Sequence, residues 1–267
     1  MLNFLNSLLL AMHIQVFKPE RSTPVLLQTD EVIVWNIGQG QWVSIVTQDK
    51  CLHLDMGGEH VNWLPILNSC GEKQNLAYFS HWDLDHISFA RPALRKFKYF
   101  CVAAMPGGPV TSDRKLEMLS QIPRCEQNVK NDLEEVKTTG LQTQLRRKLS
   151  SNDYSRVFTF NSWLLSQGDS TRAQEKTWVT NLKQPIKIKI LILGHHGSRT
   201  SSSEELIANL TELKMGISSA RKSRYGHPHI EVLQRLKKHG VAALLTEDWG
   251  NIHFEIPNQE NKAHSLN

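Results

Sequence analysis

The chain contains little cysteine: Cys51, Cys70, Cys101 and Cys125 are the four cysteines in 267 residues. No two of them form a Cys-x-x-Cys pair, which excludes zinc ribbons and thioredoxin-like redox chemistry. Four cysteines in a chain of this length are also too few for a disulfide-rich scaffold. We therefore expect four separate small residues, each buried in the core or exposed on the surface.

The chain also lacks heptad patterns, internal repeats and low-complexity tracts, which excludes coiled coils, solenoids and repetitive disordered proteins. Hydrophobic residues make up 40% of the composition, enough to bury a core. The net charge is +5 and the isoelectric point is about 9.0. This modest basic balance suits a polyanionic substrate, but it is weak support when taken alone.

No apolar run is long enough to span a membrane. The run in residues 2–17 is interrupted by Asn3, Asn6 and Ser7, whereas a spanning helix needs roughly 20 apolar residues. It also lacks the basic start and the small-residue cleavage site of a signal peptide. We expect a buried or interfacial helix here, then a linker from Lys18 to Pro24, in a chain that is soluble or peripheral to a membrane.

The most informative stretch is His81-Trp82-Asp83-Leu84-Asp85-His86, which directly follows an apolar, strand-like run at residues 75–80. Carboxylate oxygens and imidazole nitrogens are ligands for zinc, manganese or iron. The alternative is a solvated acidic turn with stray histidines, in a chain that has 12 of them. We favour a metal site because four such groups follow a buried strand at this spacing.

This loop resembles the His-x-His-x-Asp-His motif of the metallo-β-lactamase superfamily. Asp83 stands where most members carry the second histidine, and an aspartate there is similar to the hydrolase domains of ComEC-type competence proteins. The resemblance implies an α/β fold, a four-layer αβ/βα sandwich with metals at the edge between two sheets. An oxygen ligand in place of nitrogen favours manganese or magnesium over zinc.

Other motifs follow the order of ComEC-type domains. The segments 37–41 and 55–58 resemble the opening of those domains, although Gln41 replaces an aspartate. Gly168-Asp169, after a strand at 162–166, resembles the aspartate that bridges two metals in the superfamily. A simple N-cap of a helix at 170–182 is the alternative for Asp169.

The resemblance leaves the first metal one ligand short, because no histidine occurs between His86 and His195. Asn152, Asp153 or water would have to complete its ligands. We place this gap where other members of the superfamily carry a third metal-binding histidine.

The segment His195-His196-Gly197-Ser198 matches the His-His-Gly-Ser element of ComEC-type domains and follows a β-branched run at 186–193. At least one of its histidines should bind metal. Ser198, Thr200 and the start of a helix at Ser202 would form an anion cradle. The alternative is a capping box with Ser202 or Ser203 as N-cap, and both can hold together.

The segment 221–229 resembles a basic loop that ends in Tyr-Gly-His-Pro. Its cations suit phosphate contact, and we favour His227 as a donor to substrate phosphate over a metal ligand. The expected groups are then as follows: metal ligands His81, Asp83, Asp85, His86, Asp169, His195 and His196; catalytic residues Asp85, His86 and Asp169; substrate contacts Ser198, Arg199, Thr200, Arg221, Lys222, Arg224 and His227.

Periodicity and turn residues predict the remaining elements. Residues 111–150 are predicted to be helical and polar, with the basic cluster 146–148 either on a solvated face or in a phosphate-binding groove. Expected strands cover 31–36, 42–48, 51–55, 75–80, 99–104, 156–160, 162–166, 186–193, 213–219, 241–246 and 251–256.

The resemblance implies a metal-dependent hydrolase that holds one or two divalent ions, Zn²⁺ or Mn²⁺. The expected activity is that of a phosphodiesterase or nuclease on DNA, related to DNA uptake in competence. A hydrolase of small phosphodiesters or esters and a non-catalytic binding module are the alternatives. DNA and a membrane channel protein are the expected partners. Oligomeric state stays open.

We divide the chain into an N-terminal apolar segment and linker at 1–24 and a hydrolase domain at 25–267. The N-terminal segment could also be the remnant of a longer membrane protein, since ComEC carries its hydrolase domain after membrane helices. The compartment stays open, either cytoplasmic or, as the resemblance would imply, membrane-associated or periplasmic.

Overall fold

The computed structural model describes residues 30–110, 112–126, 133–137 and 149–256. The N-terminal segment at 1–24 and the basic cluster at 146–148 lie outside these residues, so the predictions for them stay predictions. Across the described ranges, the model contains no helix of the length and apolarity that a membrane crossing requires.

The described residues form two six-stranded sheets. The first has the strand order β12-β1-β2-β3-β4-β5, and the second has the order β11-β10-β9-β8-β7-β6. The first sheet comprises β1 (Asp30–Val34), β2 (Gln41–Val46), β3 (Lys50–Gly57), β4 (Gln74–Tyr78), β5 (Tyr99–Ala104) and β12 (Ile252–Ile256). The second comprises β6 (Leu133–Val136), β7 (Val157–Phe160), β8 (Leu164–Ser166), β9 (Ile190–Ile192), β10 (Met215–Ser218) and β11 (Ala242–Leu245).

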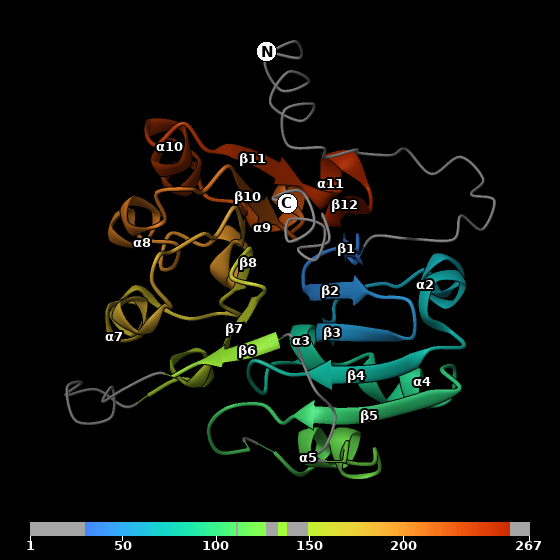
Figure 1. The fold of residues 1–267 in the computed structure, drawn as a ribbon. Coiled ribbons are helices and arrows are strands. Elements are labelled where there is room, and N and C mark those ends of the chain that lie inside the picture. The colour runs from blue at the N-terminus through green and yellow to red at the C-terminus, as the bar shows by residue number, and fades with distance from the viewer. Residues whose placement is uncertain (1–29, 111, 127–132, 138–148, 257–267) are drawn as a thin grey trace, which may run out of the picture.

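Helices cover the outer side of each sheet (Figure 1). The first half of the chain supplies α2 (Trp63–Cys70), α3 (Leu84–Ile87), α4 (Ala90–Leu94) and α5 (Asp113–Ser120). The second half supplies α7 (Arg172–Trp178), α8 (Glu204–Asn209), α9 (Lys222–Tyr225), α10 (Ile230–Lys238) and α11 (Thr246–Trp249). Three 3₁₀ turns join them: η1 (Ser151–Tyr154), η2 (Val179–Asn181) and η3 (Gly194–Gly197).

Three apolar clusters separate the layers. One lies between the sheets, where Val32 and Val34 of β1 meet residues such as Phe160 of β7. A second packs the other face of the first sheet, including Ile33, against α2, α4 and α5. The third packs the second sheet against α7, α8 and α10. Successive strand residues therefore enter different cores, and the predicted four-layer α/β sandwich is confirmed.

Parallel pairing gathers the functional loops at one edge. Strands β3, β4 and β5 run parallel to one another, as do β8, β9, β10 and β11. The carboxyl ends of parallel strands meet at the same edge of their sheet. The loop His81–His86 follows β4, Asp169 follows β8, and His195-His196 follows β9. The topology thus brings three distant motifs to one place.

Two sequence predictions about secondary structure are wrong in part. Within 111–150, α5 is the predicted helix, but residues 133–136 form strand β6 at the edge of the second sheet. Its polar sequence Leu-Glu-Glu-Val is typical of an edge strand, because one side of such a strand faces solvent. The long apolar run at 186–193 contributes only residues 190–192 to β9.

The prediction of four separate cysteines is also wrong. Cys51 is bonded to Cys70, and Cys101 is bonded to Cys125. The first bond joins β3 to the end of α2, and the second joins β5 to the segment after α5. Partners 19 and 24 residues apart form no local motif. Only the packing of a helix on its sheet brings them together.

His53 of β3 is a buried histidine that serves the core and lies away from the edge with the motifs. Its side chain is 0% exposed and stacks on Phe97. Trp42 Nε1 donates to His53 Nδ1, while His53 Nε2 lies 2.9 Å from Asn75 Oδ1. Burial lowers the pKa of His53 to about 4. The imidazole is therefore neutral in the folded protein, with its proton on Nε2.

We expect the fold to lose stability in acid through His53. Its folded-state pKa lies below its ordinary value of 6.5, so the unfolded chain takes up the proton first, and stability falls as the pH drops from about 6.5 towards 4. The loss at the acid end is on the order of 3 kcal/mol. Urea unfolding of wild type and His53→Gln across this range should show a flatter pH dependence in the variant. An unchanged slope, matching that of a control at the exposed residue His60, His60→Gln, would contradict the assignment.

Removing the bond between Cys51 and Cys70 should destabilise the domain. A cross-link that closes a loop of this size contributes about 3 kcal/mol in the chain-entropy model. The double variant Cys51→Ala/Cys70→Ala should lower the free energy of unfolding by this order, measured by urea denaturation without reductant. Wild type in reductant should lose at least as much, since both bonds then open.

Candidate metal centre

The motif loops place two overlapping groups of ligand atoms at the edge between the sheets. Ligand atoms of His81, His86 and Asp169 lie within 4.8 Å of one another. Ligand atoms of Asp85, His86 and His196 form a second such group. His86 belongs to both, so the two groups are contiguous. Each group combines the two halves of the chain.

Asp169 lies at the centre of the histidines. Its Oδ1 is 3.1 Å from His86 Nε2 and 3.8 Å from His196 Nε2. Its Oδ2 is 3.7 Å from His81 Nε2 and also 3.7 Å from His195 Nε2. One carboxylate therefore faces four imidazoles, two on each oxygen. This is the arrangement that a bridge between two cations requires.

The polar atoms that face each other here are buried without hydrogen bonds. His81 Nε2, His86 Nε2 and Asp169 Oδ1 make none among the described residues, and the side chains of both histidines are 0% exposed. Burying unpaired polar atoms is costly, so such a cluster needs a ligand. Imidazole nitrogen and carboxylate oxygen are good ligands for a divalent cation, and the residues present therefore fit one or two such ions.

Asp55, at the end of β3, orients both histidines of the first loop. His86 Nδ1 donates to Asp55 Oδ2 across 2.8 Å. His81 Nδ1 lies 2.9 Å from Ser80 Oγ, which in turn donates to Asp55 Oδ2. These bonds place the proton of each ring on Nδ1 and leave Nε2 facing Asp169. Carboxylates in this outer position fix the ring and raise its basicity as a ligand.

The pair His195-His196 faces the same carboxylate from the second half. His196 Nδ1 donates to the carbonyl of Ser219, so its Nε2 is left to face Asp85 Oδ2 at 3.1 Å. His195 Nδ1 lies 3.3 Å from Thr200 Oγ1 and 3.4 Å from Asn152 Nδ2. Both histidines thus reach the centre, although only His196 joins a compact group of ligand atoms.

Asn152 and Asp153, the expected substitutes for the missing histidine, behave differently. Asn152 Nδ2 lies 3.4 Å from Asp169 Oδ2, beside the centre. Asp153 Oδ2 instead accepts from Ser150 and its Oδ1 accepts from Thr171. Its carboxylate is therefore engaged elsewhere. Of the two residues, only Asn152 therefore lies beside the centre, between Asp169 and His195.

The charges of the centre shift its pKa values strongly. Burial would raise the pKa of Asp169, but the neighbouring charges of His86, His196 and His81 hold that pKa well below its ordinary value. Burial would lower the pKa of His86, but Asp169 and Asp55 raise it well above 6.5. The pKa of Asp85 is lowered to about 2, against burial, chiefly by its hydrogen bond with His196. The carboxylates are therefore ionised at neutral pH, as metal ligands must be.

Backbone geometry supports the close approach of the loops. Asp55, His195 and His196 have φ angles of 55°, 50° and 56°, a left-handed region that costs energy for residues other than glycine. Gly57 allows the metal loop to touch β3, because a Cβ there would lie 2.5 Å from the backbone nitrogen of His86. Strained backbone at three polar residues is typical of a functional site.

The residues predicted to contact substrate surround this centre, but several have other partners. Ser198 Oγ bonds to Thr200 Oγ1, which supports His195. Ser203 is the N-cap of α8, as the capping alternative expected. The amides of Ser202 and Ser203 donate to the buried carboxylate of Glu175. The start of α8 is therefore filled by the protein itself and is not an open anion cradle.

The remaining predicted contacts lie at the surface of the second half. Arg199 is exposed on the loop after η3, and Lys222 is exposed on α9. Arg221 and Arg224 pair with Glu59 of the first half. The ring of His227 is 6.1 Å from that of His195 and belongs to neither group of ligand atoms. This placement suits the predicted role in substrate contact, which stays a prediction.

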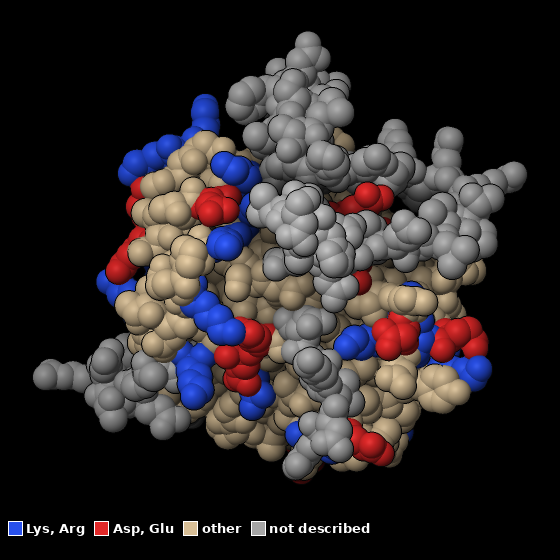
Figure 2. All heavy atoms as spheres, in the orientation of Figure 1, with Lys and Arg blue, Asp and Glu red and all other residues tan. Residues whose placement is uncertain are grey.

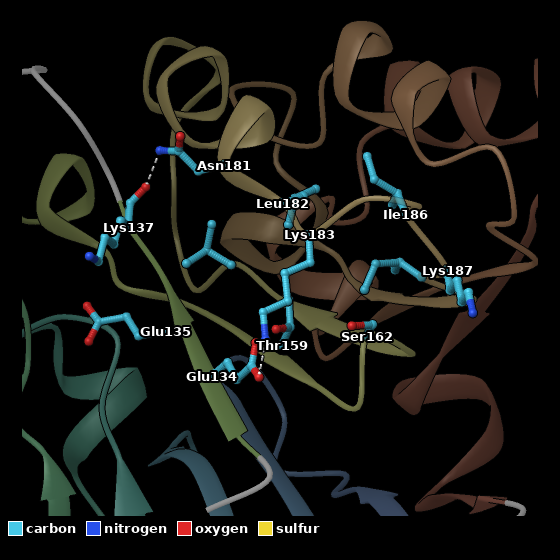
Figure 3. Close-up of a pocket in the computed structure, with 12 residues that line it drawn as sticks. Glu134, Glu135, Lys137, Thr159, Ser162, Asn181, Leu182, Lys183, Ile186 and Lys187 are labelled. Atoms are coloured by element: carbon cyan, nitrogen blue, oxygen red, sulfur yellow. Dashed lines mark hydrogen bonds and ion pairs between the residues drawn. The ribbon is translucent and has the colours of Figure 1, made fainter. Parts of the chain in front are cut away.

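A pocket of about 380 Å³ lies elsewhere, beside edge strand β6 (Figure 3). Figure 3 shows Lys183 reaching Glu134 across it, and Asn181 bonded to the backbone of Lys137. None of the residues that line this pocket belongs to the metal centre. The open edge of the centre itself is marked by Asp83 and Asp85, whose side chains are 34% and 37% exposed.

Comparison with known proteins agrees with this geometry. No family model matches the chain. The ComE operon protein 3 of Bacillus subtilis is 32% identical over 269 residues, covering 88% of this chain and 34% of that protein. The competence protein ComA of Neisseria gonorrhoeae is 27% identical over 242 residues, covering 88% and 33%. The chain thus spans about a third of the length of these curated relatives.

Among solved structures, the metallo-β-lactamase fold protein YhfI from Bacillus subtilis covers 85% of this chain and 100% of its own. The TM-score is 0.50, at 11% sequence identity. The chain has the metallo-β-lactamase fold. The resemblance predicted from the loops at 81–86 and 195–198 is therefore confirmed, for the fold and for the similarity to competence proteins.

Sequence reasoning missed the residues that support the candidate ligands of this centre. The sequence indicated Asp55 only as part of an opening motif. Asp55 lies near the end of β3, next to strand β4, which carries the loop at 81–86. That position is a usable signal, because neighbouring parallel strands end at one edge. Gln41 donates to both Asp55 and Ser166, which an aspartate in its place could not do. Lys115, which pairs with Asp83, gave no signal.

Replacing Asp55 by Asn should weaken metal binding without removing a proposed ligand. Asparagine tolerates the left-handed backbone of this position, so the variant mainly removes the charge that orients His86. The dissociation constant for Mn²⁺ should rise by roughly 10- to 100-fold, measured by isothermal titration of the metal-free protein. Unchanged affinity in a folded variant would show that Asp55 is structural only.

Proposed function

We propose that this domain is a metal-dependent phosphodiesterase that cleaves DNA, with one or two divalent cations as cofactors. The observation that carries the proposal is the convergence of buried, unpaired atoms of His81, His86 and Asp169 at the sheet edge of a metallo-β-lactamase fold. Carboxylates and imidazoles form the whole donor set, since all described cysteines are in disulfides. Such a set suits Mn²⁺ as well as Zn²⁺.

The proposed ligands are His81, Asp83, Asp85, His86, Asp169, His195 and His196. When bound, the cations supply the Lewis acidity that activates water and stabilises charge on the phosphoryl oxygens. Asp169 would hold two subsites together through its two oxygens. Asp55 holds the rings of His81 and His86, so the ligand geometry exists before the cation arrives.

Substrate would enter at the open edge, where Asp83, Asp85 and His195 keep a third of their side chains exposed. Two carboxylates at the entrance repel a phosphodiester unless cations are bound. The cofactor would therefore be required for binding as well as for chemistry. Arg199, Lys222 and His227 would position the backbone of a nucleic acid.

DNA as the substrate is supported by the similarity to two competence proteins. The lysine and arginine side chains on the loops beside the centre support it as well. The net charge is only +5, and Figure 2 shows basic and acidic side chains interspersed on the face it presents. Affinity for DNA would come from the basic side chains near the centre. We also propose a membrane channel protein as a partner, as the resemblance of the sequence to ComEC-type domains implied.

The two disulfides support folding in an oxidising compartment. Disulfides that persist are typical of proteins outside the reducing cytosol. All four cysteines are paired. We therefore favour the membrane-associated or periplasmic alternative over the cytoplasmic one.

Metal analysis with cleavage assays tests the proposal. Purified protein should carry stoichiometric metal by mass spectrometry and cut plasmid or single-stranded DNA in Mn²⁺. Asp85→Ala should reduce cleavage by at least about 100-fold, because it removes a proposed ligand. Asp248→Ala, which changes an exposed carboxylate on α11, is the matched control and should cleave normally.

Two outcomes would redirect the proposal. Bound metal with hydrolysis of bis(p-nitrophenyl) phosphate but not of DNA would identify a small-ester hydrolase of the same fold. Absence of both metal and hydrolysis would leave a binding module.

A further inference from the structure

The first part of the basic segment next to the metal centre is held by polar contacts and not by packing. We call residues 221–229, which include α9, the basic arm. Helix α9 has four residues, and none of them is buried. A helix this short is not stable by itself. Its position must therefore come from the side chains that tether it.

Most of these tethers end on one carboxylate from the other half of the chain, Glu59. Its Oε2 accepts from the backbone nitrogen of Gln39 and from Arg221 Nη1, each at 3.1 Å. Its Oε1 accepts from Arg224 Nη1 and Tyr225 Oη, each at 3.0 Å. Three of the four donors belong to the arm. A second carboxylate, Glu247 of α11, accepts from Ser223.

The backbone around Glu59 is fixed in turn. Its amide donates to the carbonyl of Ile37 across 2.9 Å. Gly38 has a φ of +74°, and a Cβ there would lie 2.5 Å from Glu59 Oε2. Burial would raise the pKa of Glu59, but hydrogen bonds from Gln39, Tyr225 and Arg221 lower it, so the group is ionised at neutral pH. A single isolated surface pair contributes little, whereas several donors on one ordered carboxylate form a network.

The arm is also joined to the loop that carries His195 and His196. His229 N donates to the carbonyl of Gly197 across 2.8 Å, and a Cβ on Gly197 would lie 2.6 Å from Pro228. The end of the arm at His229 is thus fixed by its contacts with the loop that carries His195 and His196. At its beginning, the guanidinium groups of the arginines are held by Glu59, while the backbone of Arg221 donates to Gln39 Oε1 and Ser223 donates to Glu247.

The arginines keep capacity for a further anion. The side chains of Arg221 and Arg224 are 39% and 59% exposed, whereas that of Glu59 is 20% exposed. A guanidinium has five donors, and the bond with Glu59 uses one Nη1 of each. Their other edges can therefore meet phosphate while Glu59 stays in place.

We infer that Glu59 is a positioning residue that holds Arg221 and Arg224 where they contact phosphates flanking the one that is cleaved. The inference rests on the proposed phosphodiesterase function. Glu59 acts only through the arginines and touches no reacting atom. The ligand that these arginines would bind is a polyanionic strand and not a small diester, because they lie on the arm, outside the proposed metal ligands.

Kinetics of Glu59→Ala test the inference. KM for a single-stranded oligonucleotide in Mn²⁺ should rise by roughly tenfold, with kcat changed less than about twofold, as expected when a binding contact is lost. kcat/KM for bis(p-nitrophenyl) phosphate should not change. Loss of two phosphate contacts should reduce the slope of log affinity against log salt by about 1.4. Glu59→Gln keeps one acceptor oxygen and should fall between wild type and Glu59→Ala.

A mutant cycle separates positioning from general damage. In the background Arg221→Ala/Arg224→Ala, Glu59→Ala should have no further effect on oligonucleotide binding. Glu204→Ala is the matched control, since Glu204 also accepts from two side chains, those of Lys238 and His239, but lies on α8. It should match wild type in each assay.

Three results would overturn the inference. Tighter binding by Glu59→Ala would show that Glu59 masks the arginines. If Glu59→Ala weakened oligonucleotide binding equally in the background Arg221→Ala/Arg224→Ala, its role would be structural. A lower kcat/KM of Glu59→Ala for bis(p-nitrophenyl) phosphate would show the same. Fluorescence anisotropy of the labelled oligonucleotide needs no turnover, so the inference is tested even if wild type cleaves no DNA. In that case only the proposed function fails.

Discussion

The buried carboxylate of Asp169 is the constraint on which the rest of the structure depends. A charge removed from water is tolerated only when it is compensated. His81 and His86 reach it from a loop of the first sheet, and His196 reaches it from a loop of the second. Neither half could compensate this charge alone. The two halves must pack together for Asp169 to be buried. Folding of the sandwich and formation of the site therefore depend on each other.

Packing the two halves together still leaves some buried polar atoms of the centre without hydrogen bonds. Asp83, Asp85 and Asp169 bring three carboxylates to a place where buried atoms of His81, His86 and Asp169 still lack hydrogen bonds. Histidine protons can offset the charge, and the raised pKa values of His86 and His196 show that tendency. A divalent cation offsets it better, because it supplies charge and coordinates the unpaired atoms together. The protein has fixed the protons of these rings on Nδ1, which is the state that leaves Nε2 available.

Much of this could be predicted from the sequence, because the ligands sit in compact motifs that directly follow apolar strands. The loop at 81–86 and the pair His195-His196 were identifiable on that basis, and their order along the chain led to the fold. The supporting residues were not identifiable in the same way. Asp55 and Ser80 act through geometry that only parallel strand pairing creates, and the partners of Cys51 and Cys101 are set by helix packing. Strand β6 was missed because a polar edge strand has no alternation strong enough to compete with helical propensity.

The centre and the arm differ in how the protein holds them, and this difference bears on specificity. Four of the proposed ligands, His81, His86, Asp169 and His196, are buried. Hydrogen bonds fix the three histidine rings, which leaves them little freedom to adapt to different substrates. Arg224 lies on α9, a helix without buried residues, and Arg221 lies at its N-cap. Both arginines are partly exposed and pair with a carboxylate from the opposite half. On the proposed function, changes at the centre would alter which cation is held, whereas changes at Glu59 and the arm would alter which anion is brought to it. A fold organised in this way can keep its chemistry while its substrate changes through a few surface charges.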